Sequence, residues 1–375
     1  MAARAMSKDA HRASLLTYAA AQTARVAFYG IHYIAARVLA WENFARIDVP
    51  PHPLPPLATT LSAMRDLFVQ DWKNVEAGLY PTPVDLAAEL RRASISARYL
   101  ADIPRVAGRQ KRRSHHEVRG ANGDLPRYYR QNFHFQTGGY LSDDSARLYD
   151  FQVEALFAGT ADAMRRRAYG PLARFLDAMK TRAPVLLDVG AGTGRFLSFV
   201  KSVRPDLKAI ALDLSEPYLK RARRNLAKYR NIRYIAAPAE KMPIPDASID
   251  AAVSIYLFHE LPPKVRAGVA KEIARVLKPG GLFVLAESIQ YGDAPEFEGL
   301  IDVFPSLMHE PYYASYVRTD LDEMFGSAGL KRESSDIAYL TKIVTFRKPA
   351  ARGRRGSLYE TGKRAARKQK SRPSG

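Results

Sequence analysis

The 375-residue sequence contains no cysteine, which excludes disulfide bonds, thiolate zinc sites and a cysteine nucleophile. Long apolar runs are also missing. Residues 15–41 are apolar but interrupted by Arg25 and Arg37, and they fall short of the roughly 20 uncharged residues that a spanning helix needs. We expect a packed helix there or, alternatively, an interfacial helix or lid over an oily substrate, because bulky residues such as Phe28 and Trp41 occur in it. The opening segment lacks the apolar core of a secretory signal, so we expect a cytoplasmic protein.

Acidic residues are scarce relative to basic ones, 38 against 58, which gives a net charge of +20. Such an excess suits nucleic acid, an anionic membrane surface or an acidic substrate. Residues 183–346 are nearly neutral, with 21 basic and 20 acidic side chains, whereas residues 347–375 hold 11 and one. The last segment has almost no apolar residues after 347. We therefore expect a disordered basic tail at 348–375 that docks on an anionic membrane or another polyanion.

Helical patterns separated by breaks occupy the first part of the chain. The proline-rich segment 50–56 predicts a stiff connector, and helical spacing resumes at 57–78 and 84–101. The basic polar stretch 109–124 predicts an exposed loop. These features together indicate a helical accessory or lid region at 1–140.

Linking helices are expected at 141–182. Ser142, followed by two aspartates, predicts the N-cap of a helix that continues through Arg167. From residue 183 onward the pattern changes, because short apolar runs alternate with helical spacing. This alternation predicts an α/β domain with a parallel sheet, and the run 337–348 predicts its final strand.

The most informative motif is the glycine loop Asp188-Val189-Gly190-Ala191-Gly192-Thr193-Gly194, which follows an apolar strand and opens a helix. A dinucleotide fingerprint would place a third glycine where Arg195 stands. An acid two residues before the first glycine suits an ammonium group better than a pyrophosphate. Asp213, which ends the next strand, can accept both hydroxyls of a ribose. The loop therefore indicates a ligand that carries adenosine and a cationic end but no phosphate.

At these residues the sequence resembles the class I S-adenosylmethionine-dependent methyltransferases. The segments LLDVGAGTGRFL, ALDLSEPYLKRAR and RVLKPGGLFVLAES are similar to the family's motifs in order and spacing, closest to the methyltransferase-11 branch with its ubiquinone and menaquinone C-methyltransferases. The resemblance covers about 175–347 and leaves the helical N-terminal region outside. It implies a Rossmann-like sheet, mostly parallel with an antiparallel last strand, in an S-adenosylmethionine-binding methyltransferase domain at 183–347.

The resemblance also implies a set of cofactor-binding residues. The glycine loop would hold the methionine part, Asp213 the ribose, and Leu214 with the Ala-Glu pair the adenine, while Ser254 would face the methyl group. The implied residues are Asp188, Gly190, Ala191, Gly192, Thr193, Gly194, Asp213, Leu214, Ala239, Glu240 and Ser254.

Candidate catalytic residues follow the fourth strand, namely Tyr256, His259 and Glu260. His259 is the best candidate base, since an imidazole ordinarily titrates near neutral pH. Alternatively, His259 and Glu260 brace the next helix. Glu287, which ends the fifth strand, is a further polar candidate.

Two aromatic segments are candidates for a lid or for substrate contact, with ordinary packing as the alternative. One contains His134 and Tyr140 with a Gly-Gly hinge, and the other contains His309 and Tyr313. No cluster of Cys, Asp or Glu joins the pair His115–His116 at ligand spacing, so we expect a solvated loop there and no metal site.

The leading functional hypothesis is methyl transfer from S-adenosylmethionine to the carbon or oxygen of a small, lipophilic acceptor. The alternatives are a nucleic-acid methyltransferase, suggested by the charge, and a cofactor-binding scaffold without catalysis. The sequence does not predict the oligomeric state.

Overall fold

The computed structural model describes residues 8–40, 50–118, 120, 125–180 and 183–350. The predicted disordered tail at 348–375 lies almost entirely outside the described residues, and so does Trp41. Among the helices that the structure describes, none is both long and apolar enough to cross a membrane.

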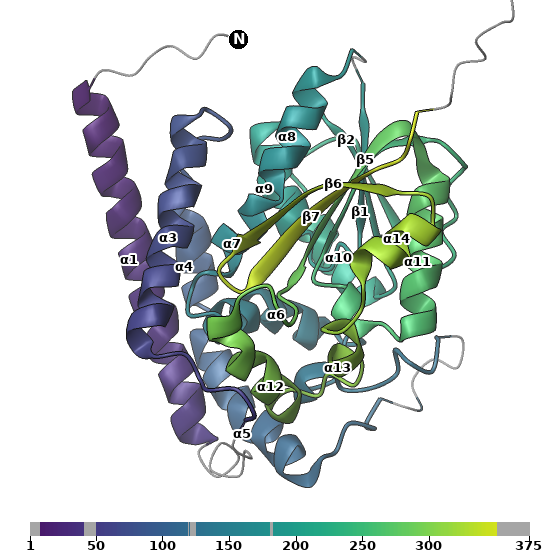
Figure 1. The fold of residues 1–375 in the computed structure, drawn as a ribbon. Coiled ribbons are helices and arrows are strands. Elements are labelled where there is room, and N and C mark those ends of the chain that lie inside the picture. Colours follow the sequence, from purple (N-terminus) through teal and green to yellow (C-terminus); the bar gives the residue numbers. More distant parts are fainter. Residues whose placement is uncertain (1–7, 41–49, 119, 121–124, 181–182, 351–375) are drawn as a thin grey trace, which may run out of the picture.

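A seven-stranded sheet forms the centre of the molecule, in the order β3-β2-β1-β4-β5-β7-β6 (Figure 1). The first five strands are parallel, and β7 runs antiparallel to both β5 and β6. The predicted mostly parallel α/β fold is thus confirmed. The strands are β1 (Val185–Val189), β2 (Lys208–Asp213), β3 (Ile232–Ala236), β4 (Ile249–Ile255), β5 (Leu277–Ser288), β6 (Lys331–Ala338) and β7 (Thr341–Arg347).

Helices cover both faces of the sheet. On one face, β-strand side chains pack with α11 and α14 around Phe283, and on the other with α8 and α9 around Val284. The alternation along β5 explains this, because successive side chains of a strand point to opposite faces. The helices that follow β1 are α9 (Arg195–Val203), α10 (Glu216–Asn225), η2 (Phe258–Glu260), α11 (Pro263–Val276), η3 (Pro295–Phe297), α12 (Glu298–Leu307), α13 (Tyr313–Tyr316) and α14 (Leu321–Ser327).

The N-terminal helices pack against one side of this domain, with α1 along the outer edge beside α3 (Figure 1). Tyr29 of α1 is fully buried against Phe151 of α6, whereas Ile31 and Ile34 are more than half exposed. The expectation of a packed helix therefore holds for one face of α1. The N-terminal elements are α1 (Lys8–Leu39), α3 (Leu57–Glu76), α4 (Leu86–Ala93), α5 (Ser96–Arg112), η1 (Phe133–Phe135), α6 (Asp143–Leu156), α7 (Ala161–Arg167) and α8 (Tyr169–Ala178).

Three local predictions need correction. The stretch from 109 was predicted to be a loop, but α5 continues through Arg112 and buries Arg109. The helix capped by Ser142 does not reach Arg167, because it ends before Ala158 and Gly159, both at positive φ. A Cβ on Gly159 would lie 3.0 Å from the Arg25 carbonyl oxygen, so the break lets α1 approach closely.

The third correction concerns the end of the sheet. Residues 331–338 form the edge strand β6, which the sequence did not predict, and the predicted strand at 337–348 is β7 together with the turn before it. Seven of the eight β6 residues are exposed, so β6 lacks the apolar alternation that reveals a half-buried strand.

Candidate functional site

The glycine loop lies at the carboxyl edge of the sheet between β1 and α9, where β1 is flanked by β2 and β4. Open α/β sheets bind ligands at such a position. Gly190, Gly192 and Gly194 have φ of 75°, 54° and 74°, a region that favours glycine. A Cβ on Gly194 would lie 2.7 Å from Leu226 Cδ1, whereas one on Gly192 would meet no atom within 4 Å. The absence of a side chain at Gly194 therefore lets the start of α9 pack closely against Leu226. The absence of one at Gly192 leaves the backbone accessible to a ligand.

Two acidic residues lie beside the glycine loop, and they differ in whether their carboxylate oxygens have hydrogen-bond partners. Asp213 accepts hydrogen bonds from the backbone N–H groups of Gly192 at 2.7 Å and Ser215 at 2.8 Å. Asp188 is 1% exposed, and its Oδ2 has no hydrogen-bond partner among the described residues. Burial, together with the nearby charge of Asp213, raises the pKa of Asp188 to about 8. An unpaired buried carboxyl of this kind is stabilised by a cation.

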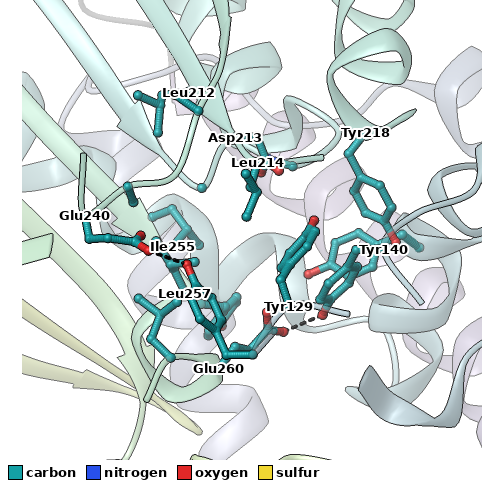
Figure 2. A pocket seen from close by; sticks show the side chains of 18 residues that line it. Tyr129, Tyr140, Leu212, Asp213, Leu214, Tyr218, Glu240, Ile255, Leu257 and Glu260 are labelled. Carbon is teal, nitrogen blue, oxygen red and sulfur yellow. Dashed lines mark hydrogen bonds between the residues drawn. The ribbon is translucent and has the colours of Figure 1, made fainter. Parts of the chain in front are cut away.

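A cavity of about 80 Å³ adjoins the loop. Figure 2 shows tyrosine rings on one side and Glu240, Ile255 and Leu257 on the other. The Tyr128 hydroxyl donates to Glu240 Oε1 at 2.8 Å and so closes one end. The lining residues are Tyr128, Tyr129, Tyr140, Tyr149, Gly190, Gly192, Leu212, Asp213, Leu214, Tyr218, Ala237, Ala239, Glu240, Ile255, Tyr256, Leu257, Glu260 and Leu261.

The predicted cofactor-binding residues divide into two groups. Those that line the cavity are Gly190, Gly192, Asp213, Leu214, Ala239 and Glu240. Asp188, Ala191, Thr193, Gly194 and Ser254 are not among its lining residues. Two of these fix the loop from behind, because the Thr193 hydroxyl donates to Asp150 Oδ1 at 2.6 Å and the Ser254 hydroxyl donates to the Val189 carbonyl at 3.0 Å. Their roles toward a cofactor stay predictions.

Of the three candidate catalytic residues, Tyr256 and Glu260 line the cavity and His259 does not. His259 Nδ1 lies 2.7 Å from Glu287 Oε2, while Glu287 Oε1 accepts the Phe258 N–H at 2.5 Å. Burial acts to lower the pKa of His259, but Glu287 outweighs it and raises that pKa to about 10. An imidazolium bound to a carboxylate suits the alternative, in which His259 braces the turn after β4.

The lid candidates meet at Glu260. The Tyr140 hydroxyl donates a hydrogen bond to Glu260 Oε1 (Figure 2). The Nε2 atom of His134 lies 3.8 Å from the same oxygen. His134 is also in contact with Glu310, which follows α12. Burial, together with Glu310, raises the pKa of Glu260 to about 7. The structure thus places Tyr140 in the cavity wall and His134 next to Glu260, outside the cavity lining.

The other two lid candidates support this wall from behind. The His309 carbonyl accepts the His134 N–H at 3.2 Å, and its ring stacks on His115 at 4.0 Å between centroids. Tyr313 is buried, and its hydroxyl lies 2.8 Å from Ser288 Oγ. Within the described residues, then, neither side chain lines the cavity beside the glycine loop.

Several residues in or next to the cavity wall were not singled out from the sequence. Tyr129 and Tyr149 flank the first aromatic segment, so the density of tyrosines between 127 and 150 was a usable signal. Tyr218 sits in the first turn of α10, where its motif position gives no such hint. Glu310 lies in the second aromatic segment and becomes informative only through its neighbours in space.

Comparison with known proteins gives one matching family model, described as a methyltransferase domain, over residues 187–285. A demethylmenaquinone methyltransferase from Chlorobaculum tepidum is 34% identical over 39% of this chain and 57% of its own length. A malonyl-[acyl-carrier protein] O-methyltransferase from Marinomonas sp. is 35% identical over 31% of this chain and 42% of its own length. The chain thus spans about half the length of these relatives.

Among solved structures, a 1,6-didemethyltoxoflavin-N1-methyltransferase from Burkholderia thailandensis, with bound 1,6-didemethyltoxoflavin and S-adenosylhomocysteine, is 20% identical. The match covers 55% of this chain and 88% of that one, with a TM-score of 0.39.

Proposed function

We propose that the whole chain methylates a small, lipophilic acceptor, because residues 187–285 form a methyltransferase domain. The sequence resemblance predicted both this domain and its dependence on S-adenosylmethionine. The methyl group is carried to a carbon or an oxygen of that acceptor. The observation that carries the proposal is the wall of tyrosine rings opposite the open backbone of Gly192.

The residues at the glycine loop fit the cofactor. Asp188 has a buried carboxylate oxygen without a donor, which suits the ammonium end of S-adenosylmethionine. Asp213 lies beside Gly192 at the cavity, where its carboxylate suits the ribose hydroxyls. When bound, the sulfonium supplies an activated methyl group, which the acceptor takes as the carbon–sulfur bond breaks and its electron pair returns to sulfur. The chain's own task is to align the acceptor with that methyl group and to exclude water.

We place the acceptor beside the tyrosines and Glu260 that line the cavity. Tyr129, Tyr140, Tyr149 and Tyr218 contribute aromatic rings to this lining, which favour a flat, apolar molecule over a charged polymer. Glu260 is the carboxylate that we place against the acceptor. We assign His259 a positioning role toward Glu260, because the imidazole ring of His259 is held by Glu287.

A labelled-methyl assay tests the proposal. The purified chain is incubated with S-adenosylmethionine carrying a labelled methyl group and with lipid extract, phenols and reduced quinones. We expect label in a molecule that organic solvent extracts. Glu260→Gln should lower kcat/KM at least tenfold, whereas Glu298→Gln, a carboxylate outside the cavity lining, should leave it within twofold. Label that enters only nucleic acid or protein would contradict the proposal.

For the basic tail at 348–375 we propose docking on an anionic surface, supported by its 10 basic residues against one acidic. A chain that ends at Ala350 should lose binding to vesicles that contain an anionic phospholipid. Binding of the full chain should fall as salt screens the charges. Equal binding by both chains would contradict this role.

A further inference from the structure

Three side chains from distant parts of the sequence converge next to the cavity. His134 comes from η1, Glu260 from η2, and Glu310 from the segment between α12 and α13. One nitrogen of the imidazole and one oxygen of each carboxylate lie within 4.8 Å of one another. Such a separation is compatible with joint coordination after small side-chain adjustments, because metal–ligand bonds of about 2.0–2.2 Å hold their donors roughly 3–4 Å apart.

The cluster has too few donors for its two carboxylates. The Glu310 side chain is fully buried, and no donor other than the His134 imidazole reaches its carboxylate among the described residues. Its one ion-pair partner among these residues is His134, which also faces Glu260 at 3.8 Å. In the described part of the chain, the Tyr140 hydroxyl is the one donor that makes a hydrogen bond to the Glu260 carboxylate. Two acids therefore share one imidazole.

Nearby positive charge does not make up the deficit. His259 is the other imidazole that acts on Glu260, and it is already bound to Glu287 at 2.7 Å. Tyr140, Tyr149 and Tyr218, which line the adjoining cavity, bring no positive charge. Burying an uncompensated carboxylate is unfavourable, so the site calls for a cation.

We propose that His134 Nε2 and one carboxylate oxygen each of Glu260 and Glu310 bind a divalent metal ion. One nitrogen and two oxygen donors suit Zn²⁺ or Mn²⁺ better than Mg²⁺ or Ca²⁺, which prefer all-oxygen sites. Three protein ligands leave at least one coordination position for another molecule. Glu260 also lines the cavity beside the glycine loop, so the ion would lie next to that cavity.

The surroundings hold the ligands in place, as metal sites require. His134 has a φ of 54°, an unusual value for a residue with a side chain, and its backbone N–H donates a hydrogen bond to the His309 carbonyl. Buried Arg109 donates to the carbonyl of Phe135 at 3.2 Å, which fixes the turn from the other side. Tyr140 orients Glu260.

The role of the ion rests on the proposed function, whereas its binding does not. A metal ion beside the methyl group would bind an oxygen of the acceptor and ease the loss of that oxygen's proton to solvent. The oxygen could then form the bond to the methyl carbon. This narrows the acceptor to molecules with a phenolic, enolic or similar oxygen, and it favours O-methylation.

Metal binding is tested directly on the full chain after treatment with a chelator. We expect one Mn²⁺ or Zn²⁺ per chain by calorimetry and elemental analysis, and a Mn²⁺ electron paramagnetic resonance signal that changes on binding. Glu310→Gln and His134→Asn should each weaken binding at least tenfold. Asparagine is chosen at 134 because it tolerates positive φ.

His52→Asn is the matched control. His52 also lies between two carboxylates, at 2.9 Å from Asp302 and 3.2 Å from Glu298, but it uses a different ring nitrogen for each. Its substitution should leave metal affinity within twofold. Unchanged binding of S-adenosylhomocysteine shows that the variants remain folded.

The absence of stoichiometric metal binding to the parent chain would overturn the proposal, and so would equal affinity of all variants. In the first case the cluster is a set of acids that share a proton. If metal binds and the variants lose it, but no acceptor is methylated, the metal site stands and the proposed function fails.

Discussion

Arg166 of α7 makes a two-pronged ion pair with Asp71 of α3, through Nε to Oδ1 at 2.9 Å and Nη2 to Oδ2 at 2.6 Å. Asp71 is fully buried and also accepts the hydroxyls of Tyr18 at 2.7 Å and Tyr80 at 2.6 Å. One carboxylate therefore joins α1, α3 and the loop after it to α7. This pair fixes the N-terminal helices onto the helices that cover the sheet.

Asp71→Asn should destabilise the protein by about 3–5 kcal/mol, because it leaves the Arg166 guanidinium buried without its counter-charge. The measurement is the free energy of unfolding by urea, followed by circular dichroism. Asp66→Asn, which removes an exposed carboxylate from the same helix, should change it by less than about 1 kcal/mol. Equal effects of the two substitutions would show that the buried pair does not hold the regions together.

Cofactor affinity should fall as the pH drops below about 8. The raised pKa of Asp188 means that the carboxyl is mostly protonated at pH 6, and it must lose that proton to bind an ammonium group. We expect up to roughly tenfold weaker S-adenosylmethionine binding per pH unit between 7.5 and 5.5. Calorimetry in buffers of different ionisation enthalpy measures the released proton. Asp188→Asn should bind weakly with a much flatter dependence, and a parent chain with flat affinity would contradict the assignment.

The same carboxyl should make the ligand-free protein less stable at high pH. Its pKa is about 8 in the folded protein and ordinarily near 3.8, so ionisation favours the unfolded state and stability falls as the pH rises through this window. Asp188→Asn removes the charge, and its Tm should exceed that of the parent at pH 8.5 but not at pH 4. A lower Tm at pH 8.5 would mean that the carboxylate is satisfied in solution.

Two glycines of one loop should respond differently to alanine. Gly192→Ala places its Cβ in open space, so the cost comes from the positive φ and should lower the free energy of unfolding by roughly 1–2 kcal/mol. The substitution should also weaken S-adenosylhomocysteine binding strongly. Gly194→Ala meets Leu226 as well and should destabilise the fold more. Paired measurements of Tm and ligand affinity separate the effects. The reverse ranking in Tm would contradict the geometry.

Arg109→Met should loosen the aromatic segment without unfolding the sheet. Arg109 donates to the Phe135 carbonyl at 3.2 Å and to the Thr137 hydroxyl at 3.0 Å. Its loss should speed trypsin cleavage at Arg127 or Arg130 several-fold, as read by mass spectrometry. Arg105→Met, one turn earlier on the exposed side of α5, is the control. Equal cleavage of the two variants would contradict a holding role.

Local sequence patterns were sufficient to place the glycine loop and Asp213 in the sheet, whereas their roles toward a cofactor stay predictions. Gly190 to Gly194 follow β1 directly, and Asp213 ends β2, so spacing alone places them at one edge. The fold class followed from the same alternation of strands and helices. These features depend on residues that are close together in the sequence and on the order of the motifs along the chain.

Features that depend on long-range packing were not predictable. Arg109 looks like one of several solvated charges until Phe135 and Thr137 approach it, so its stretch was assigned to a loop. His259 had the right chemistry for a base, but its partner Glu287 lies on another strand and raises its pKa. No spacing rule connects residues 134, 260 and 310.

The matched domain ends at 285 and begins at 187, whereas His134 and Glu310 lie on either side of it. Two of the three ligands of the proposed metal site therefore come from outside the matched domain, and Glu260 comes from within it. A protein that shares the matched domain but not residues 125–141 and 308–313 would keep the glycine loop and lack this metal site.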